Sequence, residues 1–545
     1  MAVDIVAENA KTAGVTSHTE TALSGYGDIT VAGFARQPSV NVGETINFSI
    51  DGGATTVDIY RVGYYGGNGW RLVDTISNTP TTQPEAQTIP NSNGATTCTN
   101  WSITASWPVP LDATSGLYCA LIRSVAPQAP NGFWAMFVVR DDDAVADIIY
   151  KTSDSTWGAA YNHYGTKSNV DGKNIYGSGV AIGNSLDRSL AVDFHRPNLV
   201  RDGVATYWQR CEQPMIRFLE RFGYTVKYIS SVDLDRDPTI LDNGTIFLSS
   251  GHDEYWSANM RNNVKNWRDG IKAGRSIFMS GNEVFWKTEF AYSGDRVTMW
   301  CRKDTMDGPT AIRSGGGGTP IVPGEWQGTW KDTRWPGKQP EWLLTGTDFR
   351  MNGIYQHNAT ILSSEVGTHP AWVNTTVSSG SNLTLSNVIG FEADEMRPTQ
   401  PAGSYKVLAG TDVSITGYFA DDNGQNYNLS GVLDWGIVSQ RYASGAVTVG
   451  FGTCQWSWAL DDFKAEVNQQ AQQFTVNLLN DLGAAPATLP SPLVTTAPHS
   501  LDEYGVVPTV PVNHITDSSG NILTPYTLSG GVPQEMTLNF YQSGP

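Results

Sequence analysis

Basic residues, long apolar runs and cysteines are all scarce in this chain of 545 residues. Its 35 lysines and arginines stand against 53 aspartates and glutamates, so the formal net charge is −18 at pH 7. A nucleic-acid partner would require a basic face, because much of its affinity comes from phosphate contacts. An anionic membrane surface attracts the same kind of basic patch. The charge balance therefore argues against both partners.

Membrane insertion and a secretory signal are not expected either. The chain has no run of about 18 apolar residues, the length that a membrane-spanning helix needs. The segment from Met1 to Lys11 contains Asp4 and Glu8 and lacks the apolar centre of a signal peptide. Only 16% of the residues are charged, whereas glycine (56) and tryptophan (18) are plentiful. This composition is typical of extracellular proteins, so we expect an extracellular, cell-surface or particle-associated location.

The five cysteines occur without any Cys-x-x-Cys spacing, which argues against a zinc site. Cys98 and Cys119 lie in one β-rich region, and we expect them to form a disulfide. Closing a loop of this length would stabilise the domain by about 3 kcal/mol. The alternative is a pair of buried thiols.

The first 143 residues divide into two parts. Residues 1–27 are polar and lack a clear period, which indicates an N-terminal arm. Residues 28–143 contain short alternating runs, such as Thr45–Ile50 and Thr56–Val62, separated by turn residues. Strands at this spacing predict an immunoglobulin-like β-sandwich. The run from Asp141 to Asp143 indicates the boundary.

Residues 144–485 alternate between strand-like and helical segments. Strand-like runs at 225–230, 245–250 and 276–280 are interleaved with helical spacing at 208–222 and 260–271. This order predicts an α/β fold with a doubly wound, mostly parallel sheet and helices on both faces. Residues 290–385 lack this pattern, so we expect an irregular insertion or lid there.

The last segment, residues 486–545, contains nine prolines, which exclude a helical domain. We expect an extended C-terminal arm or a small β segment that docks on a neighbouring subunit. The chain is therefore expected to be a homo-oligomer or to bind an assembly partner.

Three polar clusters follow predicted strands of the α/β domain: residues 251–256, 280–286 and 390–395. The carboxyl ends of parallel strands meet at one edge of a sheet, so these clusters are expected to converge. Tyrosine and glutamate oxygens form a ligand set that suits a hard cation. His252 could move protons, or it could tie the strand end to a neighbouring carbonyl. Asn282 could bind a substrate carbonyl, or it could satisfy backbone groups in its turn.

The other acids of these clusters have simpler interpretations. Asp253 and Glu254 precede a helical segment, where the helix dipole favours acids, so we expect them to be the first acids of that helix. Glu283 and Glu395 are expected to be solvated.

Many pieces of residues 147–483 match one known family in order and spacing. They are Glu212 with Pro214; Phe218-Leu219-Glu220; Gly223-Tyr224-Thr225-Val226; Val232-Asp233-Leu234; Gly251-His252-Asp253-Glu254-Tyr255-Trp256; Gly281-Asn282 with Trp286; Gly328-Thr329-Trp330-Lys331-Asp332; Gly390-Phe391-Glu392; and Gln455-Trp456-Ser457-Trp458-Ala459-Leu460-Asp461. This part of the chain resembles the catalytic domain of the N,N-dimethylformamidase large subunit. The run Ile59 to Gly67 resembles the β-sandwich that often precedes that domain.

The resemblance implies a fold similar to class I glutamine amidotransferases. It also implies a mononuclear iron, held by two tyrosines and one glutamate, that hydrolyses a small formamide. Carried over by position, Tyr255 would be one tyrosine ligand and Glu392 the glutamate. The second tyrosine has no match here, and either Glu212 or Tyr207 would supply the third ligand.

Three functional hypotheses follow. The first is a metal-dependent, amidase-like hydrolase of a small amide or another C–N bond, in which His252 moves protons and Asn282 orients the substrate. The second is a non-catalytic structural protein of a cell surface, an appendage or a virus particle, built on the same scaffold, because fold does not fix function. The third is a carbohydrate-binding or carbohydrate-processing role, suggested by the 18 tryptophans.

Overall fold

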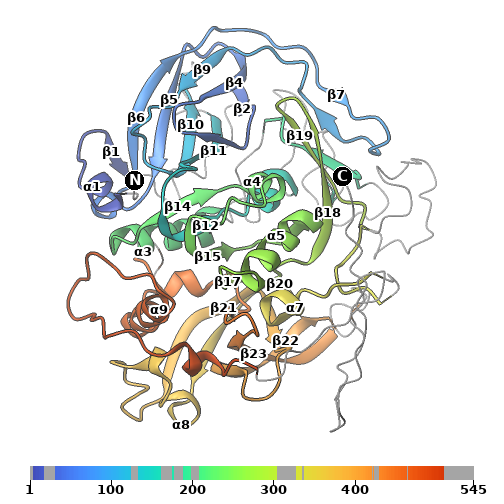
Figure 1. The fold of residues 1–545 in the computed structure, drawn as a ribbon. Helices are drawn as coiled ribbons and strands as arrows, with labels where there is room; N and C mark the ends of the chain where they lie inside the picture. The colour runs from blue at the N-terminus through green and yellow to red at the C-terminus, as the bar shows by residue number, and fades with distance from the viewer. Residues whose placement is uncertain are drawn as a thin grey trace.

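The computed structural model describes residues 4–17, 31–123, 133–160, 175–176, 188–197, 208–303, 327–333, 337–419, 422, 429–462, 464 and 466–508. The fold is mixed α/β, with one large mixed sheet and several smaller ones. Figure 1 shows the N-terminal strands in blue at one end of the molecule, and the helices α4 (Ser231–Arg236) and α5 (Ala258–Asp269) in green at its centre, beside β15 (Gly244–Gly251) and β17 (Arg275–Ser280). Antiparallel strands in yellow and orange occupy the other end.

Two sheets pack face to face at the N-terminal end. The three-stranded sheet contains β2 (Val31–Ala35), β4 (Thr45–Gly52) and β9 (Ala105–Pro108). The six-stranded sheet has the order β1 (Val15–Ser17), β6 (Gly69–Ser77), β5 (Thr56–Val62), β10 (Gly116–Ile122), β11 (Phe133–Arg140), β3 (Ser39–Asn41). Aromatic side chains from both sheets, including Phe48, Trp107 and Phe137, form their shared core.

The N-terminal segment is more ordered than the expected arm. Within residues 4–17, helix α1 (Ile5–Asn9) is capped by the Asp4 side chain, which accepts a hydrogen bond from the Ala7 N–H at 2.8 Å. Strand β1 then pairs with β6. Apart from Ile5, which enters the hydrophobic core, the segment is held largely by hydrogen bonds and ion pairs, so hydrophobic periodicity could not reveal it.

The expected Cys98–Cys119 disulfide is absent, because all five cysteines are free and buried. Cys98 belongs to the core between the two N-terminal sheets. Cys119 lies on β10 and packs into the core that the outer face of that sheet shares with the α/β region. The two thiols therefore lie in different cores, and the alternative of two buried thiols holds.

The large sheet has nine strands in the order β14-β12-β15-β17-β24-β23-β21-β20-β22. The first five are parallel: β14 (Val226–Ile229), β12 (Ala146–Lys151), β15 (Gly244–Gly251), β17 (Arg275–Ser280) and β24 (Val447–Gly450). The pairings from β24 onward are antiparallel. The expectation of a mostly parallel sheet thus holds for one half only.

Helices cover both faces of the parallel half. On β15, Ile246 and Leu248 point into the core that contains α3 (Gln213–Arg221) and α9 (Gln469–Asp481). Phe247 points into the opposite core, against α4 (Ser231–Arg236) and α5 (Ala258–Asp269). Successive side chains of a strand point to opposite faces of the sheet, so each face of β15 packs on a different layer of helices.

The stretch expected to be an irregular insertion contains regular strands. Strands β18 (Trp286–Ser293) and β19 (Arg296–Trp300) form an antiparallel pair, and β20 (Thr347–Ile361) runs through the large sheet beside β21 (Leu383–Met396). Register shifts interrupt the pairing of β20 with β21 at three places. Such bulges break the alternation of apolar and polar residues, which is why the sequence pattern did not indicate a strand. The sheet is completed by β22 (Tyr405–Tyr418) and β23 (Leu429–Arg441).

The first part of the expected C-terminal arm, residues 486–508, packs on α9. The Gln473 side chain exchanges hydrogen bonds with the backbone of Val494, at 2.7 and 3.0 Å. Asp481 accepts hydrogen bonds from the His499 backbone and the Tyr504 hydroxyl, both at 2.8 Å. The rest of that segment lies outside the described residues. Among the described helices, none is long and apolar enough to cross a membrane.

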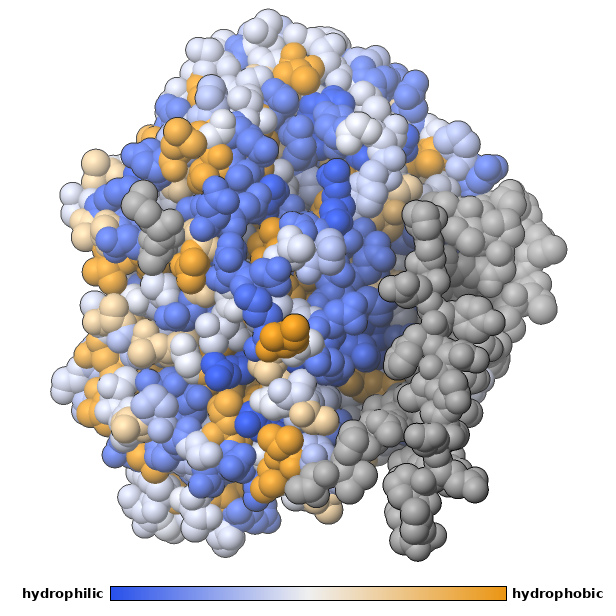
Figure 2. All heavy atoms as spheres, in the orientation of Figure 1, coloured by the Kyte–Doolittle hydropathy of each residue, from blue (hydrophilic) through white to orange (hydrophobic). Residues whose placement is uncertain are grey.

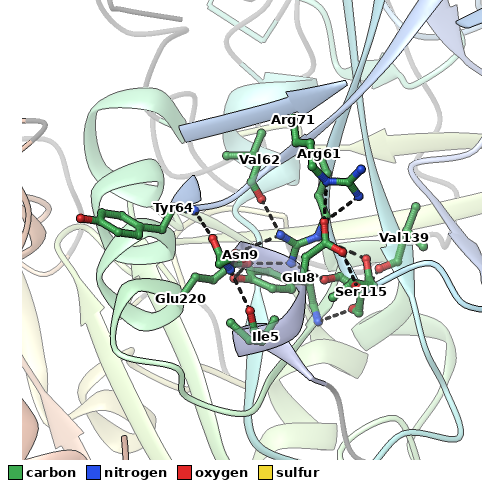
Figure 3. A network of polar contacts seen from close by, with 12 residues as sticks. Ile5, Glu8, Asn9, Arg61, Val62, Tyr64, Arg71, Ser115, Val139 and Glu220 are labelled. Carbon is green, nitrogen blue, oxygen red and sulfur yellow. Dashed lines mark hydrogen bonds and ion pairs between the residues drawn. The ribbon is translucent and has the colours of Figure 1, made fainter. Parts of the chain in front are cut away.

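A buried polar network joins the N-terminal sheets to the α/β region (Figure 3). Arg61 on β5 forms two hydrogen bonds to Glu220 on α3, at 2.7 and 2.9 Å, and both side chains are fully buried. Asn9 on α1 donates to the same carboxylate at 2.8 Å, and neighbouring Glu8 pairs with Arg71 at 2.7 Å. One ion pair therefore ties together a helix, a strand of the N-terminal sheets and a helix of the α/β region.

Candidate functional site

The site lies where β15 and β17 end. β15 stops at Gly251, whose φ of +97° favours glycine, and a side chain there would lie 3.0 Å from Cγ of Glu212. The next residues are buried, and β16 (Tyr255–Ser257) follows them directly. Helix α5 begins only at Ala258, with Ser257 as its N-cap. Asp253 and Glu254 are therefore not the first acids of that helix, because the short strand β16 separates them from it.

His252 lies between two carboxylates. Its Nε2 is 3.1 Å from Oε2 of Glu392 and 3.4 Å from Oε2 of Glu254, and its Nδ1 is 3.3 Å from the Gly281 carbonyl. A carbonyl can only accept, so the Nδ1 contact favours a protonated Nδ1. Burial lowers the pKa of His252, but the Glu392 carboxylate and then Glu254 raise it, and the net direction is upward. The contacts thus stabilise the imidazolium form.

Asn282 lies on the same carboxylate and links two strands. Its Nδ2 donates to Oε2 of Glu392 at 2.9 Å, and its backbone N–H donates to Asp394 at 2.7 Å. Residue 282 has a φ of +50°, which asparagine tolerates better than most residues. Glu392 and Asp394 both lie on β21, so Asn282 ties the end of β17 to this antiparallel strand.

Gly281 makes this approach possible. A Cβ at position 281 would lie 2.3 Å from the backbone oxygen of Glu392 and 3.0 Å from the backbone nitrogen of Cys454. Both neighbours are backbone atoms, which cannot move as a flexible side chain can. The absence of a side chain at 281 therefore lets β21 bring Glu392 against His252 and Asn282.

A second part of the site contains two phenols and an ammonium group. The hydroxyls of Tyr255 and Tyr176 contact each other closely, and Nζ of Lys303 donates to the Tyr255 oxygen at 3.0 Å. The ammonium lies 3.6 Å from the ring centroid of Tyr176 and 4.5 Å from that of Trp286. Trp286 in turn donates through Nε1 to Glu254 at 2.7 Å. Glu254 therefore borders both parts of the site.

Burial controls the protonation of this second part. It raises the pKa of Tyr255, with further contributions from Glu254 and Tyr176, so the phenol stays protonated. Burial also lowers the pKa of Lys303 to about 8, against the opposing effect of Glu254. Lys303 therefore carries its charge at neutral pH and places a cation beside the Tyr255 oxygen and over the Tyr176 ring.

The three side chains predicted to hold iron have different neighbours. Glu212 is fully buried and accepts hydrogen bonds from the Ser153 N–H at 3.2 Å and from Nε1 of Trp157 at 2.6 Å. Glu392 contacts His252 and Asn282, whereas Tyr255 contacts Tyr176 and Lys303. The other predicted ligand, Tyr207, lies outside the described residues.

Glu212, Glu392 and Tyr255 contact different groups in this structure, and the iron site stays a prediction. Hard cations need several oxygen ligands at about 2–2.5 Å around one point. Here the Lys303 ammonium already lies beside the Tyr255 oxygen and would repel a metal cation. In the part of the chain that the structure describes, no group of three His, Cys, Asp or Glu residues is placed to hold a metal, a statement that does not cover a ligand set containing Tyr255.

A buried acidic cluster lies behind the site, beneath the sheet edge. Both oxygens of Asp253 accept from Nζ of Lys151 at 2.7 Å, and Ser249 donates to Asp253 at 2.8 Å. Glu283 was expected to be solvated, but it is 1% exposed, and neither of its carboxyl oxygens has a hydrogen-bond partner. Burial and then Asp253 raise its pKa, which favours a neutral carboxyl. Glu395 is partly exposed and pairs with Arg350 at 3.1 Å.

Sequence reasoning missed Tyr176 and Lys303. Neither residue follows a predicted strand or belongs to a segment of clear period, and Lys303 comes just after the end of β19. Only the tertiary fold brings them beside Tyr255. Lys151 was missed as well; it is the last residue of β12, where an unpaired buried charge would be costly.

The clusters at residues 251–256, 280–286 and 390–395 meet as expected, but for a different reason in the third case. Glu392 lies inside an antiparallel strand and not at the end of a parallel one.

In comparison with known proteins, no curated sequence matches the chain. A family model described as N,N-dimethylformamidase beta subunit-like, C-terminal, matches residues 56–472. The match covers well over half of the chain and includes every residue of the site, so the protein belongs to this family.

Proposed function

We propose that the protein is a hydrolase that cleaves the C–N bond of a small amide at the site formed by His252, Glu392, Asn282, Tyr255 and Lys303. The observation that supports this most strongly is the position of His252 Nε2 between the carboxylates of Glu392 and Glu254, at 3.1 and 3.4 Å. A charged imidazole beside a carboxylate supplies both an acid and a base to one reacting centre.

The carbonyl of the substrate would bind on the Lys303 side of the site. The Lys303 ammonium and the Tyr255 hydroxyl lie 3.0 Å apart and are both hydrogen-bond donors. Buried donors of this kind stabilise the negative charge that develops on a carbonyl oxygen during attack. Three aromatic rings around the ammonium exclude water, which strengthens that interaction.

Water attack and departure of the amine would use Glu392 and His252. The Glu392 carboxylate takes a proton from the attacking water as its oxygen bonds to the carbonyl carbon. The His252 imidazolium then gives its proton to the leaving nitrogen as the C–N bond breaks. The proton on Glu392 returns to His252 across their 3.1 Å contact, which restores both groups. Asn282 holds Glu392 in place by its hydrogen bond at 2.9 Å.

Burial indicates that the substrate is small. The His252 side chain is 0% exposed, that of Glu254 is 4% exposed and that of Glu392 is 13% exposed. Only the outer part of Glu392 meets solvent, so a bulky substrate could not approach the imidazole without movement of the chain. We therefore propose formamides and acetamides, the smallest amides, as substrates.

Amine or ammonia release from N,N-dimethylformamide, formamide and acetamide tests the proposal. We expect His252→Gln and Glu392→Gln each to lower kcat by about 100-fold or more, because general acid–base groups contribute factors of this size. Glu395→Gln is the matched control, since it removes a carboxylate from the same strand that pairs with Arg350 and not with His252. Equal losses in all three variants, or no hydrolysis of any amide by the native protein, would overturn the proposal.

Metal analysis of the same preparations tests the scheme in which Lys303 supplies the cation. We expect no stoichiometric iron. One iron per chain, with a visible tyrosinate charge-transfer band that disappears in Tyr255→Phe, would overturn this scheme and support the ligand set implied by the family.

A further inference from the structure

A cavity of about 530 Å³ lies on α5, away from the residues of the candidate site. Its walls come from α5 between Arg261 and Asp269, from α7 (Trp342–Thr345) and the segment that leads into it, from residues 399–400 after β21, and from the turn at 442–444 after β23. Figure 2 shows hydrophilic residues gathered over this part of the molecule. The volume is within the range of sites that bind small organic molecules.

The charge of the cavity is opposite to that of the protein. Four cationic side chains line it, and Asp269 is the one acid among the lining residues that the structure describes. The four cations are Arg261, Lys265, Arg268 and Lys338. Three positive charges are therefore in excess, in a chain whose formal net charge is −18. A basic hollow in an acidic protein selects anions from solution.

Asp269 neutralises only part of this charge. It accepts hydrogen bonds from Arg268 at 2.7 and 3.1 Å and pairs with Lys265 at 3.2 Å. The Arg268 guanidinium also lies 3.8 Å from the ring centroid of Tyr442, which fixes its plane. This arrangement holds the arginine rigidly at the wall before any ligand arrives.

Arg261 adds a buried positive charge to the wall of the cavity. It is 3% exposed, and its Nη2 donates to the Pro340 carbonyl at 2.8 Å, but its Nη1 has no hydrogen-bond partner. Arg261 stacks over Trp330 at 5.1 Å. Nη1 is itself buried, and Glu341 opposes the lowering of the Arg261 pKa by burial, so this side chain contributes positive charge to the wall and not a hydrogen bond to a ligand.

The uncharged lining indicates the rest of the ligand. Side-chain amides of Asn262, Asn266, Gln339 and Gln400 and the hydroxyl of Ser444 border the cavity, whereas its apolar side chains are few. Amides and hydroxyls both donate and accept, as sugar hydroxyls do. An excess of three positive charges favours a dianion over a monocarboxylate.

We propose that this cavity binds a sugar phosphate, with the phosphate near Lys265 and Lys338 and the hydroxyls on the surrounding amides. The site is separate from the proposed hydrolytic site and does not depend on its activity. It would give the protein a second, regulatory or substrate-delivering ligand of a chemistry unrelated to amides.

Calorimetric titration of the whole chain with glucose 6-phosphate, glucuronate and inorganic phosphate tests the proposal. We expect glucose 6-phosphate to bind most tightly. The double variant Lys265→Gln/Lys338→Gln should weaken it about fivefold or more, because each exposed charge contributes up to about 1 kcal/mol. Both lysines are exposed, so the variant should fold.

Lys272→Gln is the matched control, since Lys272 is an exposed lysine just after α5 that does not line the cavity. Binding that the double variant leaves unchanged, or that the control weakens equally, would overturn the site. Equal affinity for inorganic phosphate would overturn the assignment of a sugar, and tighter binding of glucuronate would overturn the preference for a dianion.

Discussion

At the scale of single residues, the fold keeps several acids in surroundings that oppose their ionisation. Glu283 and Glu212 are fully buried, and burial followed by Asp253 raises the pKa of both. Lys151 is the buried cation that partly balances this cluster. Neutral carboxyls behind the site can support its structure without adding negative charge. The electrostatic field at His252 is then determined by Glu254 and Glu392.

Asp154 allows a test of how burial opposes the ionisation of an acid in this protein. Burial raises its pKa to about 6, against the effect of Lys151, and its Oδ2 has no hydrogen-bond partner. The native state therefore holds a proton between about pH 4 and pH 6 that the unfolded chain releases. The stability contributed by this group is complete below about pH 4 and is lost as pH rises through 6. The shift corresponds to about 3 kcal/mol.

The substitution Asp154→Asn should remove this loss of folding stability at rising pH. We expect urea unfolding to show that the variant gains stability relative to the native protein between pH 4.5 and pH 7. Asp112→Asn, at an exposed position, is the control and should show no such gain. A pH-independent difference between Asp154→Asn and the native protein would contradict the assignment.

At the scale of elements, the site depends on how closely β21 approaches the end of β17. Gly281 permits that approach, and β21 lies between β23 and β20 in the antiparallel half of the sheet. The parallel half supplies His252 and Asn282, and the antiparallel half supplies Glu392. The chemistry therefore sits near the junction of two kinds of β structure.

Gly281→Ala should separate the two halves at the site. The added Cβ would collide with backbone atoms of Glu392 and Cys454, so we expect a loss of about 1–3 kcal/mol in the free energy of unfolding and most of the amidase activity. Gly410→Ala is the control, because a Cβ on this β22 glycine meets only ordinary contacts at 3.7 Å or more. Full activity in Gly281→Ala would show that Glu392 need not lie against His252.

The sequence predicted those elements whose apolar and polar residues recur with a regular period. β15 and β17 are short buried runs that end in polar clusters, so both their positions and their polar ends could be predicted. β20 and β21 could not be predicted in full, because register shifts interrupt their alternation. Lys303 and Tyr176 enter the site through tertiary contacts only, and no local pattern marks either residue. The site was therefore predictable where it follows strand ends and hidden where distant segments complete it.

At the scale of the whole molecule, the N-terminal sheets and the α/β region share buried structure. The outer face of the six-stranded sheet contributes Trp70 and Trp134 to the same core as Trp208. Arg61 and Glu220 add a fully buried ion pair across the same boundary. The family match also begins at residue 56, within the N-terminal sheets. These observations indicate that the two regions unfold as one unit.

Removing one partner of the buried pair tests this coupling. We expect Glu220→Gln to lower the free energy of unfolding by about 3–5 kcal/mol, because it leaves the Arg61 guanidinium buried and uncompensated. Asp142→Asn breaks a more exposed pair with Arg140 and should cost less than about 1 kcal/mol. The double variant Arg61→Met/Glu220→Met should be less harmful than Glu220→Gln alone. Two separate unfolding transitions in the native protein would contradict the coupling.

The five free, buried thiols have a consequence for where this protein can fold. No oxidant is needed to complete its structure, and no cross-link exists for a reductant to remove. Burial also raises the pKa of the thiols of Cys119, Cys211, Cys301 and Cys454, which keeps the reactive thiolate form rare. We therefore expect urea unfolding of the protein to give the same free energy with and without a thiol reductant.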